Sequence, residues 1–395
     1  MTYPFDQESQ SCASSAVLID NPDRSRGDIC PGTLKLHQAE DGAVGRVRFP
    51  GGKISAQQWA IIADIAEEFG DKTIHITTRG NMQFRGVKDE LGFADKVSAE
   101  GLLPSRAHDK IRNMIASPLS RELQPIIEEV DRTLLSDDIV AGLSGRTLFG
   151  FDAGDGTILA HRPDFGVIKN GEFWQLILGG ELTTVLMNKE DIPQVLLHAT
   201  RTWQLNRGQS WRVHENQPVR TQVEESVAET FATRRATAET PVPTPAIGER
   251  VIGWINNADG TVTLGGGLRF GFLTSQVARV LNAVGAQTTI SPGASLVIHD
   301  LKAEEAEAVV KVLAPMGIIF DVDSPWLKVT ACTGLPGCAK SHTNTQLDAT
   351  NLVTSGKDIN MLVHFSGCDR RCGHPLGAHT EYVATGDGEY EVNNR

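Results

Sequence analysis

The chain has 395 residues, of which 40% are hydrophobic and 22% are charged. This length accommodates two or three domains with a large buried core, and the composition is ordinary for a soluble globular protein. The formal net charge of -12 argues against general binding to nucleic acid or to an anionic membrane. The N-terminus lacks the pattern of a secretory signal, and no apolar run is long enough to span a bilayer. We therefore expect a cytoplasmic protein with no membrane and no nucleic-acid partner.

The first ordered unit is predicted between residues 28 and 104, after a polar and unpatterned arm at 1–27. It begins with a strand at Gly45–Pro50 that ends in a glycine turn. A helix follows, marked by the capping box Ser55-x-x-Gln58 and by apolar residues at helical spacing. Two strand-like runs and a weaker helix complete a β-α-β-β-α order, which is typical of a ferredoxin-like unit.

The middle of the chain follows a different pattern. In residues 105–216, apolar alternation and Gly/Asp turns predict strands, followed by a helix from about Ile192 to Leu205. We interpret this region as a central α/β domain. Residues 217–250 are rich in Thr, Glu, Ala and Pro, so we expect a linker with at most one short helix, at Val223–Phe231.

The order of the first unit returns in residues 251–322. A strand at Thr261–Leu264 and a glycine turn precede a helical stripe from Val277 to Val284, then two strands and a second helix. Equivalent features are separated by about 214 to 219 residues, and glycines recur at matching places. We predict duplicated ferredoxin-like halves related by a pseudo-twofold axis. The halves are not expected to be functionally equivalent, because Ser291 stands where the first copy has Arg79.

The C-terminal region, 323–395, holds four of the six cysteines in the pattern C-x5-C…C-x3-C: Cys332, Cys338, Cys368 and Cys372. Four thiolates in two local pairs suit a metal centre. Zinc sites usually place paired cysteines closer together, whereas the wide first loop suits a cubane with irons at separate corners. An iron–sulfur cluster is favoured over zinc, disulfides and inert core cysteines. The predicted fold class is α+β: pseudo-twofold ferredoxin-like halves plus a central/C-terminal α/β cluster-binding domain.

The motifs together resemble a known superfamily. The cysteine block, Thr77-Thr-Arg-Gly-Asn-Met-Gln83 and Ile111-Arg-Asn-Met-Ile-Ala-Ser-Pro118 are similar to segments of sirohaem-dependent nitrite and sulfite reductases, which bind a [4Fe–4S] cluster through C-x5-C…C-x3-C. The opening Cys30-Pro-Gly with Arg46-Val-Arg-Phe-Pro-Gly-Gly52, and the ending around His364 to Pro375, resemble one branch, the precorrin-3B synthases of aerobic cobalamin biosynthesis. The resemblance covers about residues 28–376 without the linker.

The resemblance implies a specific chemistry. Precorrin-3B synthases are monooxygenases that use dioxygen to hydroxylate precorrin-3A at C20 and close a γ-lactone from the ring A acetate. The resemblance also implies a [4Fe–4S] cluster on the four cysteines, a mononuclear non-haem iron, and an external electron donor such as a reduced ferredoxin or flavoprotein. By proximity to the cluster, the candidate ligands of the second iron are His364, His374 and His379. No catalytic residue is assigned.

A polycarboxylate substrate calls for guanidinium groups, which bind carboxylates in a bidentate manner. The candidate substrate-binding residues are Arg46, Arg48, Arg79, Arg85, Arg112, Asn113 and Arg146. The alternative for each arginine is a solvated surface position. Cys30 has no partner at metal-ligand spacing and is interpreted as a buried thiol. Two other functions stay open: a sirohaem [4Fe–4S] nitrite or sulfite reductase, and a non-catalytic carrier of a tetrapyrrole.

Overall fold

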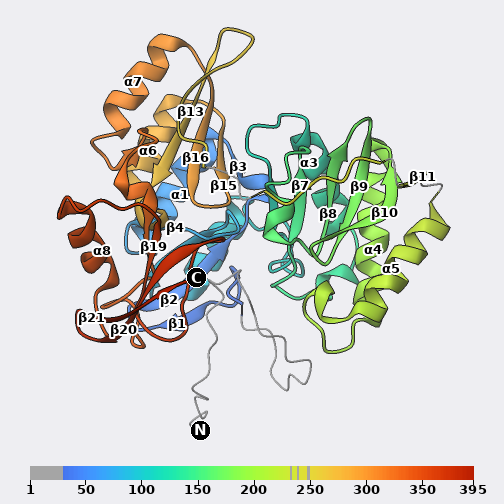
Figure 1. The fold of residues 1–395 in the computed structure, drawn as a ribbon, viewed down its shortest axis with the longest axis horizontal. Coiled ribbons are helices and arrows are strands. Elements are labelled where there is room, and N and C mark those ends of the chain that lie inside the picture. The colour runs from blue at the N-terminus through green and yellow to red at the C-terminus, as the bar shows by residue number, and fades with distance from the viewer. Residues whose placement is uncertain (1–29, 232–233, 238–239, 247–249) are drawn as a thin grey trace.

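The computed structural model describes residues 30–231, 234–237, 240–246 and 250–395. The predicted N-terminal arm lies outside this part of the chain. Figure 1 shows the fold with the central region on the right and the two halves and the C-terminal region on the left. Within the described ranges, no helix combines the length and the apolar character that crossing a bilayer requires.

The first half has the predicted element order. Its helix begins after Ser55, whose hydroxyl accepts a hydrogen bond from the Gln58 amide at 3.2 Å, while the Gln58 side chain accepts one from the Ser55 amide at 2.9 Å. This capping box satisfies backbone donors that the first helical turn leaves open. The elements are β1 (His37–Ala39), β2 (Gly42–Val47), β3 (Lys53–Ile54), α1 (Ala56–Glu68), β4 (Thr73–Ile76), β5 (Met82–Val87) and α2 (Glu90–Ala99).

The second half repeats this order, which confirms the predicted duplication. Gly285, with φ of 76°, ends its first helix in the left-handed conformation that glycine adopts without steric cost. The elements are β12 (Gly253–Asn256), β13 (Val262–Leu268), β14 (Phe272–Thr274), α6 (Ser275–Val284), β15 (Thr288–Ser291), β16 (Ser295–Leu301), α7 (Ala303–Leu313) and β17 (Ile318–Ile319).

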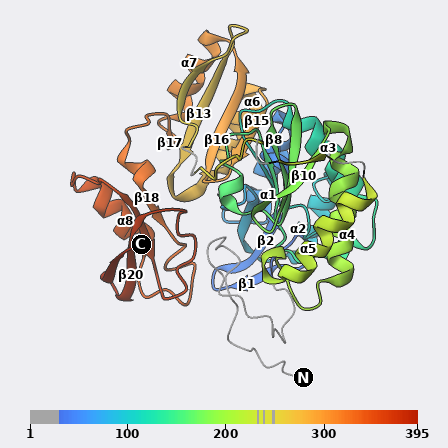
Figure 2. The same ribbon diagram turned by 45° about the vertical axis from the view of Figure 1, so that its right-hand side comes forward.

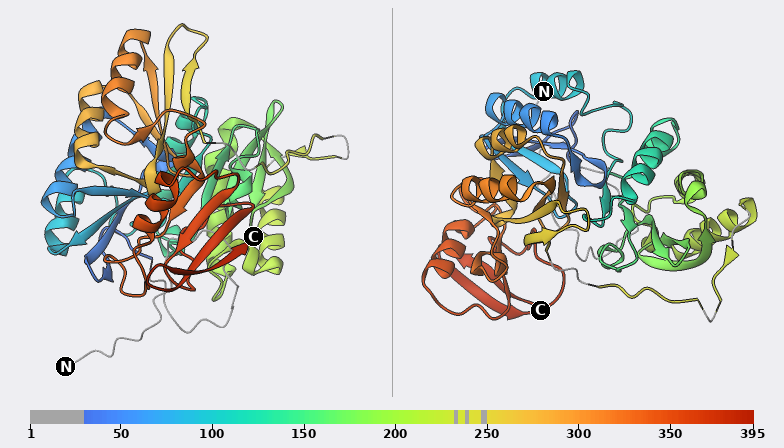
Figure 3. Two further views of the ribbon diagram at one scale, coloured as in Figure 1. Left: turned by 60° about the vertical axis from the view of Figure 1, so that its left-hand side comes forward. Right: turned by 90° about the horizontal axis from the view of Figure 1, so that it is seen from above.

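The two halves exchange short strands, a feature that the sequence pattern does not reveal. β14 of the second half pairs with β4 of the first, and β3 of the first half pairs with β15 of the second. Helices α1 and α6 pack together on one side of the sheets, where Figure 3 shows the blue and orange helices side by side. Trp59 on α1 is fully buried and donates a hydrogen bond of 2.7 Å to Thr288 on β15. The halves therefore share one hydrophobic core.

The central region is a six-stranded sheet in the order β11-β10-β9-β8-β7-β6, covered by helices. The helix predicted from Ile192 is present as α4. The predicted linker is shorter than expected, because its first part is a fourteen-residue helix, α5, whose Val223 and Val227 are buried against the core of this region. The elements are β6 (Met114–Ala116), α3 (Leu123–Leu135), β7 (Phe149–Asp152), β8 (Phe165–Asn170), β9 (Phe173–Leu178), β10 (Glu181–Met187), α4 (Ile192–Asn206), α5 (Gln217–Thr230) and β11 (Arg234–Arg235).

The C-terminal region forms a separate four-stranded sheet, which Figure 2 shows beside the halves. Strands β18, β19 and β20 are parallel, and β21 closes the sheet in the antiparallel direction. Because β18 and β19 are parallel neighbours, the chain leaves both at the same edge of the sheet. The elements are β18 (Val329–Ala331), α8 (Thr345–Thr354), β19 (Leu362–Ser366), β20 (His379–Gly386) and β21 (Glu389–Asn394).

Replacing the glycine that lies where the two halves exchange strands tests how tightly the halves are joined. Gly52 has φ of 73°, and a Cβ at this position would lie 2.0 Å from the carbonyl oxygen of Ile290 in the other half. We expect Gly52→Ala to lower the free energy of unfolding by about 3 kcal/mol or more, since backbone strain and a steric clash add. Urea unfolding followed by circular dichroism measures this change.

Gly260→Ala is the matched control. Gly260 has a similar φ of 83°, but no atom lies within 4 Å of the added Cβ, so only the backbone strain of about 1 to 2 kcal/mol remains. Equal losses in the two variants would contradict a tight junction at the exchanged strands.

Candidate functional site

The first cysteine pair is held by a tight loop between β18 and α8. Cys332 follows β18 directly, and its carbonyl oxygen accepts a hydrogen bond of 2.9 Å from the Thr345 hydroxyl at the start of α8. Gly334 has φ of 66°, and a Cβ there would lie 2.4 Å from the same hydroxyl. The Cys338 amide then donates to the Gly334 carbonyl at 2.9 Å. Glycine is therefore required for the loop to pass so close to the helix.

The second pair, Cys368 and Cys372, lies in the loop after β19 and contacts the first loop. The Gly367 amide donates a hydrogen bond of 3.2 Å to the Cys332 sulfur. A Cβ on Gly367 would lie 2.0 Å from the hydroxyl oxygen of Ser341, so the two loops pack with no room for a side chain here. The structure thus brings the two distant cysteine motifs together at one edge of the C-terminal sheet.

All four cysteines line one cavity of about 1000 Å³. Its walls come from β1, β2, β4 and β5 of the first half, from the turn between β13 and β14 and the loop after β15 in the second half, from residues 157–161 of the central region, and from the C-terminal region. The polar residues of the first-half wall include Thr77, Thr78 and Gln83, which belong to the motif identified in the sequence. A cavity at the junction of several units is a common place for a ligand site.

The cavity is strongly basic although the chain as a whole is acidic. Its basic lining residues in the described chain are Arg46, Arg85, Arg250, Lys328, Lys340 and Arg370, and its acidic one is Glu40. The field of these cations acts on a neighbouring histidine: burial, and then Arg85, Arg370, Arg46 and Lys340, lower the pKa of His37 below its usual value. An anionic ligand fits this environment.

Arg46 is the most deeply placed of these cations. It is on β2, opposite Gln83 on β5, and only 2% of its surface is exposed. Its Nε and Nη2 atoms have no hydrogen-bond partner among the described residues. Buried donors are nearly always paired, because an unpaired one forfeits its bonds to water. These two nitrogens of Arg46 are therefore suited to donate hydrogen bonds to a ligand.

Arg85 also lines the cavity, but it is already bonded to the protein. Its guanidinium makes two hydrogen bonds of 2.9 Å to Asp41 and a third of 2.6 Å to the Gly337 carbonyl, next to Cys338. This arrangement fixes the first cysteine loop to the first half. Arg85 therefore connects the basic cavity to the cysteines.

Two other predicted arginines lie near the cavity without lining it. Arg79 is 8% exposed, and burial, followed by the positive charge of Arg212, lowers its pKa to about 10, with Arg46 contributing in the same direction. Arg146 is buried with its guanidinium 4.8 Å from the ring centre of Trp211, and its Nε has no hydrogen-bond partner in the described part of the chain. Of the two, Arg79 is close enough to the cavity wall to interact electrostatically with Arg46.

Arg48 and Asn113 were predicted to bind substrate, but the structure places them in a buried hydrogen-bond network. Arg48 donates to the Asn113 side chain at 3.0 Å and to the carbonyls of Asp109 and Pro31 at 2.8 and 3.2 Å. The Asn113 amide donates to three backbone carbonyls, and its oxygen also accepts from Asn81. With so many protein partners, these side chains join the first half to the central region.

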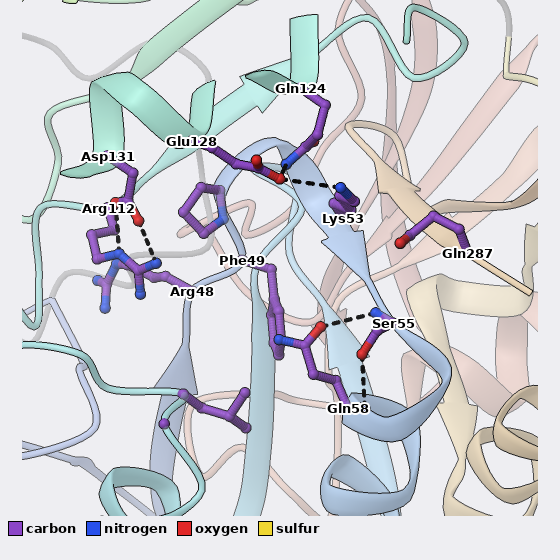
Figure 4. A pocket seen from close by; sticks show the side chains of 13 residues that line it. Arg48, Phe49, Lys53, Ser55, Gln58, Arg112, Gln124, Glu128, Asp131 and Gln287 are labelled. Carbon is purple, nitrogen blue, oxygen red and sulfur yellow. Dashed lines mark hydrogen bonds and ion pairs between the residues drawn. The ribbon is translucent and has the colours of Figure 1, made fainter. Parts of the chain in front are cut away.

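Arg112 differs from the prediction in the same way. It forms a bidentate ion pair with Asp131 on α3, with distances of 2.8 and 2.7 Å. The pair lines a second cavity of about 260 Å³, which Figure 4 shows with Lys53 facing Glu128 beside it. The basic side chains labelled in that view, other than Arg48, each face a carboxylate. This small cavity lacks the excess of positive charge that distinguishes the cysteine-bordered one.

The four cysteines provide thiol donors for a metal cluster. Burial raises the pKa of the Cys332 thiol, so its thiolate needs a cation close by. Among the described residues, no three His, Cys, Asp or Glu side chains form a closed group around a single metal ion. A tetrahedral zinc site requires such a group, whereas the irons of a cubane occupy separate corners. All four cysteines nevertheless line one cavity, and the wide spacing of the first pair is the feature that favours a cluster over zinc.

The predicted iron-ligand histidines surround the second cysteine loop. Both ring nitrogens of His364 are within hydrogen-bond distance of protein groups. His374 and His379 stack with ring centres 5.6 Å apart, and each Nδ1 lies near a backbone carbonyl. The Nε2 of His379 and one carboxylate oxygen of Glu381 are buried with no hydrogen-bond partner in the described chain.

Sequence reasoning missed several of the lining residues. His37, Arg250, Lys328 and Lys340 lie in no recognised motif, and Arg250 stands at the end of the predicted linker. Each reaches the cavity through the packing of units that are distant in sequence. Lone basic residues of this kind carry no local signal of their partners.

Comparison with known proteins agrees with the geometry. Residues 37–91 match the model of the nitrite/sulfite reductase ferredoxin-like half domain. The fold resembles that of the Mycobacterium tuberculosis NirA protein, with a TM-score of 0.68 and 17% sequence identity, over 89% of this chain and 73% of that one. Residues 37–91 thus match this half-domain family, and the chain as a whole shares the fold of the NirA protein.

The chain is similar to precorrin-3B synthase from Sinorhizobium sp, with 26% identity over 92% of this chain and 82% of that protein. It is also 25% identical to sulfite reductase [ferredoxin] 1 from Mycolicibacterium paratuberculosis, over 87% of this chain and 70% of that protein. These relatives are enzymes, which supports an oxidoreductase-type activity for this chain.

Proposed function

We propose that this protein is an O2-dependent monooxygenase of aerobic cobalamin biosynthesis. It hydroxylates precorrin-3A at C20 and forms a γ-lactone from the ring A acetate. One oxygen atom of dioxygen enters the substrate, and the other leaves as water with electrons from an external donor and protons from solvent. The extended similarity to precorrin-3B synthase supports this reaction over others of the superfamily.

The observation that carries the proposal is the meeting of four cysteines and a basic lining in one cavity. Precorrin-3A carries several carboxylates around a flat macrocycle. Nε and Nη2 of Arg46, which have no hydrogen-bond partner among the described residues, would donate to one of them. Arg250 and Arg370 line the same cavity and would meet further carboxylates. The volume of about 1000 Å³ is at the upper end of the usual range for ligand sites, as a tetrapyrrole requires.

Two histidines of the cavity act as neutral groups. Burial lowers the pKa of His161 to about 4, and His37 also has a lowered pKa. Both rings are therefore uncharged at neutral pH, and each offers one donor and one acceptor to the macrocycle edge. The arginines and lysines of the lining then supply the positive charge that binds the carboxylates of the substrate.

Cys332, Cys338, Cys368 and Cys372 would hold a [4Fe–4S] cluster in the wall of this cavity. When bound, the cluster supplies electrons one at a time from the external donor. A reduced ferredoxin or flavoprotein fits this role, and two relatives are named as ferredoxin-dependent reductases. The chain's own contribution is to place the thiolates within the same cavity as the substrate.

A mononuclear iron is not supported in the same way. His364 is engaged at both ring nitrogens, and the described residues contain no closed set of three ligands that includes His374 or His379. No step of the reaction is therefore assigned to a second iron.

The function is tested by turnover. Protein purified without oxygen is mixed with precorrin-3A, a reducing system and isotope-labelled dioxygen, and we expect one labelled atom in a hydroxylated lactone. The alternative, a sirohaem nitrite or sulfite reductase, predicts that acid–acetone extraction of the purified protein releases an iron tetrapyrrole. Extraction of sirohaem together with unlabelled precorrin-3A would overturn the proposal.

The cluster is tested by Cys338→Ser. Iron and acid-labile sulfide per chain are expected to fall by at least about 10- to 100-fold, because even the loss of an outer partner weakens a metal site that much. Cys30→Ala is the control, since Cys30 is buried outside the cavity lining. Normal iron and sulfide in Cys338→Ser would remove this cysteine from the ligand set.

Arg46→Met tests the anion site. Uroporphyrin, a stable polycarboxylate tetrapyrrole, should bind about 10- to 100-fold more weakly, since a charge-assisted hydrogen bond is lost. The thermal midpoint of the ligand-free protein should not fall, because replacing a buried unpaired charge by an apolar side chain removes a desolvation cost.

The control for this variant is Arg121→Met, which changes an arginine 61% exposed that pairs with Asp300 outside the cavity. It should bind uroporphyrin as the unaltered protein does. Unchanged binding by Arg46→Met, together with a lower thermal midpoint, would assign Arg46 a purely structural role.

A further inference from the structure

His364 lies at the point from which both cysteine loops leave the sheet. It is in the middle of β19 and is fully buried. Parallel pairing places it opposite Thr330 on β18, two residues before Cys332. On its other side, β20 places Glu381 opposite it. One side chain therefore stands between the strand that leads to the first cysteine pair and the loop that carries the second.

The two ring nitrogens bond to those two elements. Nδ1 lies 2.8 Å from the Thr330 hydroxyl, and Nε2 lies 3.1 Å from the backbone carbonyl oxygen of Cys372. A carbonyl only accepts hydrogen bonds, so Nε2 carries the proton and donates it. Nδ1 of the neutral ring then faces the Thr330 hydroxyl, whose single proton is shared between Nδ1 and the Val363 carbonyl oxygen, 3.2 Å away.

We propose that His364 is a positioning residue, which ties the Cys372 end of the second loop to β18 so that both cysteine pairs face one centre. Nε2 carries a proton toward the Cys372 carbonyl, and Nδ1 is directed at the Thr330 hydroxyl, so both ring nitrogens face protein groups and not a metal. His364 is therefore a neighbour of the cluster and not a ligand of an iron. This inference rests on the proposed cluster and specifies how the chain holds two of its ligands.

The rest of the second loop is held less directly. Arg371 donates to the buried carboxylate of Glu381 at 3.0 Å, and the Gly367 amide contacts the Cys332 sulfur at the other end of the loop. His364, by contrast, bonds directly to the backbone of a predicted ligand, the carbonyl of Cys372. Outer groups that orient ligands typically contribute 10–100-fold in metal affinity.

The test uses three variants, each reconstituted without oxygen. His364→Leu removes both hydrogen bonds, Thr330→Val removes one, and His364→Gln keeps an amide donor near the position of Nε2. The rate of iron transfer to a ferrous chelator should rise about 10- to 100-fold in His364→Leu, rise less in Thr330→Val, and stay within about threefold of the unaltered protein in His364→Gln. The midpoint potential of the cluster should follow the same order, because hydrogen bonding and solvent access set it.

Each other outcome points to a different error. Unaltered iron release in His364→Leu would overturn the positioning role. Loss of an additional iron with the cluster intact would make His364 a ligand and would equally overturn it. Where His364→Leu proves unfolded by circular dichroism, Thr330→Val decides, and unaltered iron release there counts against the proposal. Unaltered protein without iron and sulfide would defeat the proposed cluster itself, which separates the two failures.

Discussion

The parallel pairing of β18 with β19 is the constraint on which the site depends. Parallel neighbours deliver their carboxyl ends to the same edge of a sheet, so Cys332 and Cys368 emerge side by side although 36 residues separate them. Helix α8 provides the crossover that this pairing requires. The glycines at 334 and 367 then let the loops approach α8 and each other at distances that no side chain would permit. The backbone topology alone therefore brings the thiols of the two cysteine pairs to one edge of the sheet.

The second feature of the site is an excess of positive charge in the cavity. Arg48, Arg85 and Arg112 are bonded to protein acceptors and stabilise the junctions between units. Arg46 is different, because the fold buries its guanidinium and leaves two of its nitrogens without partners among the described residues. Leaving donors unpaired costs stability, and proteins tolerate such costs mainly where a ligand repays them. The exchange of strands between the halves supplies the rigid frame that holds this arginine in place.

Sequence patterns predicted much of the fold. The capping box at Ser55, the helical stripes and the recurring glycines identified two ferredoxin-like units, since these signals are local. The exchanged strands β3 and β14 were invisible, because strands of two or three residues have no period to detect. The helix at Gln217–Thr230 was predicted only as a short helix at Val223–Phe231 within a linker, because the composition of this segment is polar; the structure buries Val223 and Val227 of this helix.

The sequence predicted the cysteines of the site more readily than its arginines. Cysteine spacing is specific, and all four line one cavity. An arginine in a motif can serve a ligand or a protein acceptor equally well, and nothing local distinguishes Arg46 from Arg48. The electron paramagnetic resonance spectrum of the reduced protein, recorded with and without saturating uroporphyrin, shows whether the four cysteines hold a cluster beside the tetrapyrrole site. We expect a [4Fe–4S] signal that shifts when the tetrapyrrole binds; zinc without sulfide, or a signal that the tetrapyrrole leaves unchanged, would overturn this arrangement.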